Sequence, residues 1–163
     1  MMKIFHFLLS GALLMLLNGC LSPEPPFRQE SVFVIWKTPA MRYADQGFLT
    51  YTGVKHRLEI YANGQAVMKL TVTPERICSG VLCMSAKTFN LRYLSPEYPP
   101  ELLAHVLAGE PIFGGVGIQH NGLGVIQKIT QEGRYAIEYR VLNGSVIFRD
   151  TINHILIEIR KEE

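Results

Sequence analysis

Three cysteines are the residues of this chain with the clearest capacity for chemistry. Cys78 and Cys83 are separated by four residues, whereas redox-active pairs usually have two residues between them. No histidine lies near them at the spacing that a zinc site requires. In an oxidising compartment, two cysteines this close predict a local disulfide, which we favour over a redox pair or a metal site. Cross-linking so short a loop contributes about 2 kcal/mol of local stabilisation.

The other residue types that serve in catalysis do not form a recognisable constellation. His56, His105, His120 and His154 have no partners at metal-ligand spacing, and no serine lies in a Gly-x-Ser-x-Gly motif. The glycine-rich residues 114–124 lack the Lys-Ser/Thr pair and the following helix of a phosphate loop, and predict a mobile loop. We therefore expect no catalytic residues, no metal and no cofactor, and a protein that is not an enzyme.

Composition limits the remaining possibilities. The chain has 163 residues, of which 48% are hydrophobic and 18% are charged, with a formal net charge of +2. This apolar content excludes a disordered chain, and the near balance of scattered charges excludes a nucleic-acid-binding protein. The length suits one domain with a substantial core.

The N-terminus has the pattern of an export signal. Lys3 precedes an apolar run over residues 5–17, which is shorter than the roughly 20 residues needed to span a bilayer. Its proportions are those of the apolar region of a signal peptide. The run ends in Leu-Asn-Gly-Cys at residues 17–20, and a Pro-rich tract follows.

The motif at residues 17–20 resembles the lipobox of bacterial lipoproteins, in which the cysteine thiol receives a diacylglycerol and the chain is cut before it. The resemblance implies a signal peptide over residues 1–19, palmitate-type acylation of Cys20, a Pro-rich linker over 20–29 and a single β-rich periplasmic domain over 30–163. The alternative is an ordinary secreted protein in which Cys20 is a free or paired thiol. Because Leu21 and Ser22 follow the cysteine, without the aspartate that retains well-studied Gram-negative lipoproteins at the inner membrane, the resemblance implies the outer membrane, facing the periplasm.

Apolar residues recur at every second position through most of the domain, which is the period of a β-strand. This alternation predicts strands over residues 32–37, 48–52, 57–62, 66–73 and 154–160, together with an antiparallel meander from about residue 123 to the end. Trp36 is expected in the core, whereas Tyr43 is one of several aromatic residues that could line a cavity.

Turn residues predict how these strands pair. A type I′ turn at Asn143-Gly144 would oppose Tyr139 to Phe148 and Glu138 to Arg149. A three-residue turn at 131–133 would place Ile129 beside Tyr135. At Asn63-Gly64 the apolar positions require an odd-length loop with a bulge, and one such register opposes Glu59 to Lys69.

Helix is scarce in the sequence. Ser85 is a candidate cap for a short helical turn through residue 91, and the best helix candidate covers residues 99–108, with Gly109 just past its end. One short helix cannot cover a flat sheet of seven or eight strands. We therefore expect a mainly β (α+β) fold, in which a curled antiparallel sheet forms a half-barrel or barrel with one short helix packed across it.

The order of these parts is similar to that of LolB-type outer-membrane lipoprotein receptors. The likeness rests on Gly47-Phe48 opening a strand, the helix at 99–108 with Gly-Glu-Pro-Ile after it, and the final meander. It implies a membrane-anchored half-barrel that binds acyl chains or acylated proteins on its apolar concave face, with the helix as a displaceable lid. The residues expected to bind the ligand are Leu58, Ile60, Met68, Leu70, Tyr139 and Phe148 on the sheet, and Leu102, Leu103, Val106 and Leu107 on the helix.

A structural or assembly lipoprotein is the alternative. In that case the domain has a solid core, and an exposed edge such as residues 32–37 accepts a strand from another cell-envelope protein.

Overall fold

A computed structural model of the chain describes residues 27–162. The expected signal peptide, the expected lipidation site at Cys20 and most of the expected linker lie outside the described residues. Strand β1 (Phe27–Lys37) already begins at Phe27, so the last residues of the expected linker belong to the sheet.

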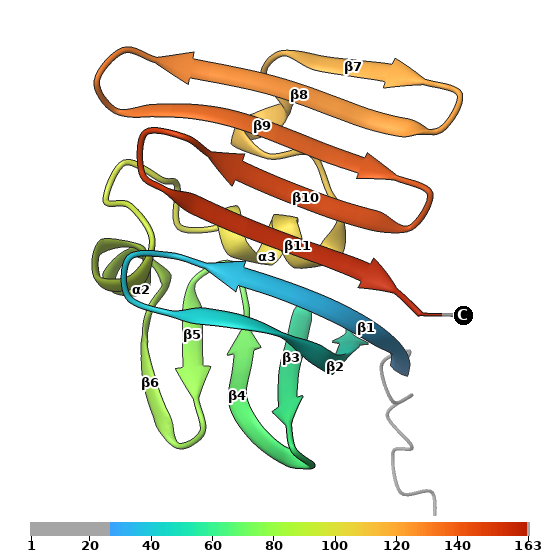
Figure 1. Cartoon of the computed structure of the whole chain (residues 1–163). Helices are drawn as coiled ribbons and strands as arrows, with labels where there is room; N and C mark the ends of the chain where they lie inside the picture. The colour runs from blue at the N-terminus through green and yellow to red at the C-terminus, as the bar shows by residue number, and fades with distance from the viewer. Residues whose placement is uncertain (1–26, 163) are drawn as a thin grey trace, which may run out of the picture.

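The described residues form one open sheet of eleven antiparallel strands, in the order β6-β5-β4-β3-β2-β1-β11-β10-β9-β8-β7. Two meanders meet where β1 pairs with β11, and the short strands β6 and β7 are the edges (Figure 1). The mainly antiparallel fold expected from the sequence is thus confirmed. The remaining strands are β2 (Arg42–Thr52), β3 (Lys55–Ala62), β4 (Gln65–Val72), β5 (Arg76–Ser79), β6 (Leu82–Ser85), β7 (Ile118–Asn121), β8 (Gly124–Gln131), β9 (Tyr135–Leu142), β10 (Ser145–Asp150) and β11 (Ile155–Lys161).

Residues 32–37 are not an edge, which corrects the expectation for this segment. Strand β1 is hydrogen bonded to β2 on one side and to β11 on the other. Its side chains alternate as expected, with Val32, Val34 and Trp36 fully buried on the concave face. The segment therefore lies in the middle of the sheet, contributes to the core and has no free edge for a partner strand.

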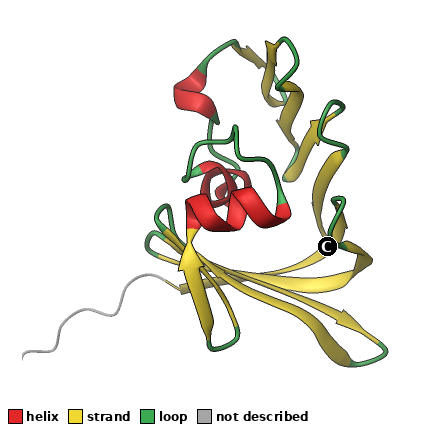
Figure 2. Ribbon diagram, turned by 90° about the vertical axis from the view of Figure 1, so that its left-hand side faces the viewer, coloured by secondary structure: helices red, strands yellow, loops and turns green. Residues whose placement is uncertain are grey.

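The concave face of the curled sheet holds two short helices (Figure 2). Helix α2 (Ala86–Tyr93) starts where Ser85 accepts a hydrogen bond from the backbone N–H of Thr88, as predicted, and continues two residues further. Helix α3 (Leu102–Ala108) starts three residues later than predicted. Residues 99–101 form a turn instead, in which the N–H of Leu102 bonds to the carbonyl of Pro99. Gly109 ends α3 with a left-handed φ of 70°, as its position predicted.

The C-terminal hairpin has the predicted register. Asn143 and Gly144 both have positive φ, as a type I′ turn requires. Tyr139 lies opposite Phe148 on the buried face, and Glu138 lies opposite Arg149 on the exposed one.

Two predicted turns differ in detail. The Asn63-Gly64 turn has two residues, and the expected bulge lies inside β4, where the register shifts between Ile60 and Tyr61. The shift restores the predicted pairing, with Lys69 Nζ 3.6 Å from Glu59 Oε1.

The predicted turn at 131–133 is displaced by one residue, and Ile129 pairs with Ile137 instead of Tyr135. The β-turn spans 131–134, which puts a glycine at the position that needs a positive φ.

The glycine-rich segment 114–124 forms more structure than the expected loop. It contains a 3₁₀ turn, η2 (Phe113–Gly115), and strand β7, which pairs with β8. Gln127 is fully buried beneath it. Its Oε1 accepts a hydrogen bond from the N–H of Ile112 at 2.8 Å, and its Nε2 donates to the carbonyls of Ile112 and Val116 at 3.0 and 2.8 Å. One buried amide thus fixes the path of the chain after α3.

A buried carboxylate fixes the connection between α2 and α3. Asp150 is 1% exposed and accepts a hydrogen bond of 2.5 Å from the Tyr98 hydroxyl. Burial alone would raise its pKa, but hydrogen bonds from Asn153, Tyr98 and the Ala136 N–H outweigh burial and hold the pKa below the ordinary value of 3.8. Tyr98 is thereby tied to β10, and with it the segment that positions both helices.

Replacing Asp150 with Asn should lower the free energy of unfolding at neutral pH by about 2 to 4 kcal/mol, because several donors lose a charged acceptor. Since the folded-state pKa lies below the unfolded one, this stabilisation is fully present above about pH 5 and is lost as the pH falls through the acid range. In urea denaturation at a series of pH values, the variant should not show this loss of stability in acid. The exposed pair Arg134–Glu97 provides the control, because Glu97→Gln should cost less than about 1 kcal/mol. An Asp150→Asn protein with wild-type stability and acid response would contradict the assignment.

Candidate functional site

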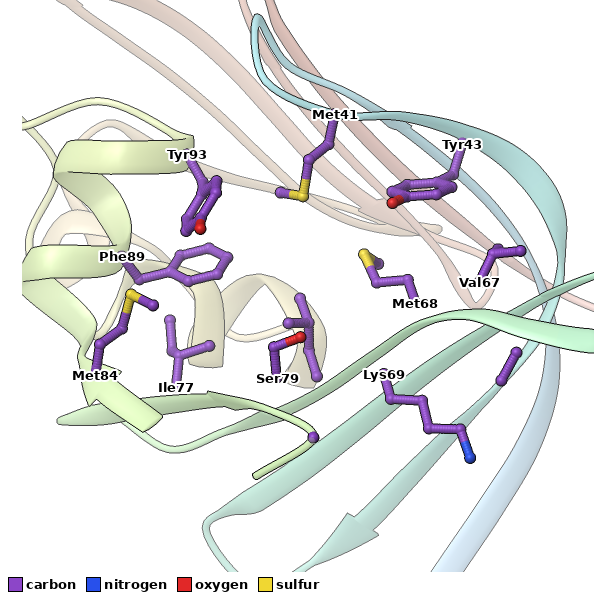
Figure 3. Close-up of a pocket in the computed structure, with 13 residues that line it drawn as sticks. Met41, Tyr43, Val67, Met68, Lys69, Ile77, Ser79, Met84, Phe89 and Tyr93 are labelled. Atoms are coloured by element: carbon purple, nitrogen blue, oxygen red, sulfur yellow. The ribbon is translucent and has the colours of Figure 1, made fainter. Parts of the chain in front are cut away.

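An open apolar groove lies beside α2, at one end of the concave face (Figure 3). Its volume of about 370 Å³ is near the lower end of the range of roughly 300 to 1,000 Å³ for ligand sites. Hollows of about 400 and 320 Å³ lie elsewhere, but only five and four residues line them. The groove is lined by Met41, Tyr43, Ala66, Val67, Met68, Lys69, Leu70, Ile77, Ser79, Gly80, Met84, Phe89 and Tyr93.

Two aromatic side chains of α2 form one wall of the groove. Phe89 and Tyr93 are four residues apart and therefore share a helix face, and their ring centroids are 4.9 Å apart. Phe89 is 3% exposed, whereas Tyr93 is only half-buried. Met41, just before β2, and Tyr43, near its start, face this wall from the other side of the groove (Figure 3).

All three methionines in residues 27–162, namely Met41, Met68 and Met84, line the groove. Methionine is unbranched and polarizable, so it adapts to ligands of irregular or variable shape. The concentration of methionine here is the feature that most clearly separates the groove from the aliphatic core.

The floor of the groove depends on the β5–β6 hairpin. The predicted disulfide between Cys78 and Cys83 is confirmed, and it links residues directly opposite each other in the hairpin. The neighbouring pair, Ile77 opposite Met84, faces the groove. The disulfide holds this floor in place although each strand of the hairpin has only four residues.

Exposed apolar side chains lie at the edge of the groove. Leu82, which is 71% exposed, lies on the same side of the hairpin as Met84 because the two are separated by one residue. Val81 at the hairpin tip is 96% exposed, and Val67 on the bulged strand β4 is 42% exposed. These side chains therefore extend the apolar lining outwards into solvent.

The ten predicted ligand-binding residues all belong to one buried cluster. Only Met68 and Leu70 line the groove. The other eight are at most 1% exposed and pack where α3 fills the concave face. A ligand would reach those eight only if α3 left its place, so their role in binding stays a prediction.

The aromatic and methionine residues of the groove were largely missed. Tyr43 was singled out as a possible cavity residue, but Met41, Met84, Phe89 and Tyr93 were not. The available signal was weak: the three methionines that follow residue 30 are far apart in sequence and meet only through the sheet register and the docking of α2.

Two titratable groups with a shifted pKa, Tyr51 and His56, lie away from the groove, near the C-terminus of α3. Burial, together with the negative charge of Glu30, raises the pKa of Tyr51 to about 12. Its hydroxyl lies 3.4 Å from both Glu30 Oε2 and the Leu107 carbonyl oxygen. Burial lowers the pKa of His56, which contacts Tyr51 edge-on. These contacts hold the end of α3 against the sheet and do not form a nucleophile–base pair.

None of the helices within residues 27–162 is long and apolar enough to cross a membrane. No protein-family model matches the chain, and no curated protein sequence matches it. The interpretation of the groove therefore rests on its geometry and chemistry.

Truncating groove residues should cost much less stability than truncating the core. We expect Met41→Ala and Met84→Ala to lower the free energy of unfolding by about 1 kcal/mol or less, because both side chains already contact solvent. Leu103→Ala, on the buried face of α3, should cost about 2 to 5 kcal/mol. Chemical denaturation measures all three, and equal losses would show that the groove is ordinary core.

Proposed function

We propose that the protein is a lipid-anchored periplasmic protein of the outer membrane that binds an acyl chain, of a lipid or of an acylated protein, in the groove beside α2. The single observation that carries the proposal is an open, methionine-lined groove at the end of a curled sheet. Such a groove can receive a flexible hydrocarbon chain without disturbing the packed core.

Burial of hydrocarbon supplies the driving force. Each methylene removed from water contributes about 0.8 kcal/mol, so even part of an acyl chain gives useful affinity. Val67 in the lining and Val81 and Leu82 on the adjacent hairpin present exposed apolar surface that the chain can contact as it enters. The expected acylation of Cys20 would keep the groove close to a lipid source.

The placement of α3 refines the mechanism implied by the resemblance to LolB-type receptors. One chain can enter beside α2 while α3 stays in place. If α3 acted as a displaceable lid, it would have to leave the concave face. That movement would break the contacts of Leu102, Leu103 and Leu107, each at most 1% exposed. We therefore propose that an acyl chain first occupies the groove, and that α3 is displaced only when a larger ligand binds.

The proposed anchor predicts covalent labelling at one residue. In a Gram-negative host grown with radiolabelled palmitate, the wild-type chain should incorporate label and lose residues 1–19, whereas Cys20→Ala should incorporate none. Cys83→Ala is the control, because it removes a cysteine but keeps the motif at residues 17–20. Equal labelling of wild type and Cys20→Ala would rule out the anchor.

The proposed groove predicts binding of a neutral apolar probe. Residues 27–163, exported with a cleavable signal sequence, should enhance the fluorescence of N-phenyl-1-naphthylamine. Met84→Glu should weaken binding about tenfold or more, because the probe would desolvate a charge. Leu91→Glu is the matched control. Leu91 lies on α2, close in sequence to Met84, but its side chain is 63% exposed and outside the groove. Equal loss in both variants, or in neither, would exclude the groove as the probe site.

A further inference from the structure

The polar groups of the groove indicate which end group of an acyl ligand it accepts. Among the residues 27–162 that line it, Lys69 alone is charged. Its ammonium points away from the centre of the groove in Figure 3 and lies 3.6 Å from Glu59 Oε1. Its contribution to the lining is therefore its aliphatic stem, and its charge is engaged elsewhere.

Three neutral hydroxyls face the groove instead. Tyr93 comes from α2, Tyr43 from β2 and Ser79 from β5, and in Figure 3 their oxygens lie on the side that faces the cavity. Within residues 27–162, the tyrosine hydroxyls that form hydrogen bonds are those of Tyr51, Tyr98 and Tyr139, and the serine hydroxyls that do so are those of Ser85 and Ser95. The hydroxyls of the three groove residues thus have no partner among these residues. They can donate hydrogen bonds to a ligand oxygen without first breaking a bond inside the protein.

Resting on the proposed function, we infer that the groove selects an uncharged acyl ester, such as a glyceride, over a free fatty-acid anion. A carboxylate drawn into this lining would lose water and gain no cation in exchange. An ester carbonyl and a neighbouring glycerol hydroxyl lose less hydration and can accept hydrogen bonds from the hydroxyls of Tyr43, Tyr93 and Ser79. The ligand class is thus an acyl chain bound through an ester to a neutral head.

Two photoactivatable probes with the same diazirine-bearing chain test this selectivity, one a free fatty acid and the other its 1-monoacylglycerol. The full-length chain is reconstituted in phosphatidylcholine vesicles at about pH 9, where the carboxyl is ionised. Mass spectrometry then quantifies cross-links to groove residues. We expect about tenfold more groove labelling by the ester than by the acid.

Hydroxyl-deletion variants test the assignment of the polar groups. Tyr43→Phe, Tyr93→Phe and Ser79→Ala should each reduce ester labelling by roughly twofold to tenfold, the range of one hydrogen bond. Tyr61→Phe is the control, because Tyr61 packs on Phe48 and does not line the groove.

The outcomes separate the two proposals. Labelling by the acid equal to or above that by the ester overturns the selectivity but leaves acyl binding intact. Ester preference that all three hydroxyl variants retain in full overturns the role of the hydroxyls, and the inference with it. Absence of groove labelling by either probe, in protein with an intact disulfide and native circular dichroism, contradicts acyl binding itself.

Discussion

Burial of α3 against the concave face is the interaction on which the rest of the structure depends. Five of its seven residues are buried, and they complete a core that the sheet alone could not close. A seven-residue helix is only about 10 Å long, however, whereas an eleven-residue strand such as β1 extends over roughly 36 Å. The helix therefore covers the middle of the curled sheet and leaves its end beside α2 incompletely filled, and the groove lies there.

Polar contacts at both ends of α3 make this arrangement specific. Tyr139 donates a hydrogen bond to the Glu110 carbonyl at 2.9 Å, and Tyr51 contacts the last turn of the helix. On the other side, the Tyr98–Asp150 hydrogen bond fixes the connection to α2. Each of these contacts links a strand of the sheet to the helical segment. These contacts within the protein therefore position the helical segment, and with it the walls of the groove, without a ligand.

The sequence revealed those parts of the fold in which local chemistry and the apolar period agree. The Asn143-Gly144 hairpin was predicted correctly because turn type, apolar parity and the opposed charges of Glu138 and Arg149 all indicate one register. At Asn63-Gly64 these signals conflict, and the conflict is resolved by a bulge at Val67, two residue pairs beyond the turn, a position that the sequence does not indicate. The four-residue strands β5, β6 and β7 are too short for alternation to show.

The candidate site was harder to predict than the fold. An alternation pattern shows that Leu58 or Phe148 points inwards, but it cannot show whether a helix or a ligand then covers that side chain. The groove exists because of a mismatch between helix length and sheet size, together with the docking of α2, and both are properties of tertiary packing. The three methionines are far apart in sequence, and their shared location shows only when the fold brings Met41, Met68 and Met84 together.

Hydrogen–deuterium exchange tests most directly whether α3 is a fixed part of the core and the groove is the binding surface. The full-length chain in phosphatidylcholine vesicles is compared with and without added 1-monomyristoylglycerol. The account predicts that amides of α2 and of the β5–β6 hairpin exchange more slowly with the lipid present, while those of α3 stay protected and unchanged. Faster exchange of the α3 amides on lipid addition, with no change around the groove, would contradict it.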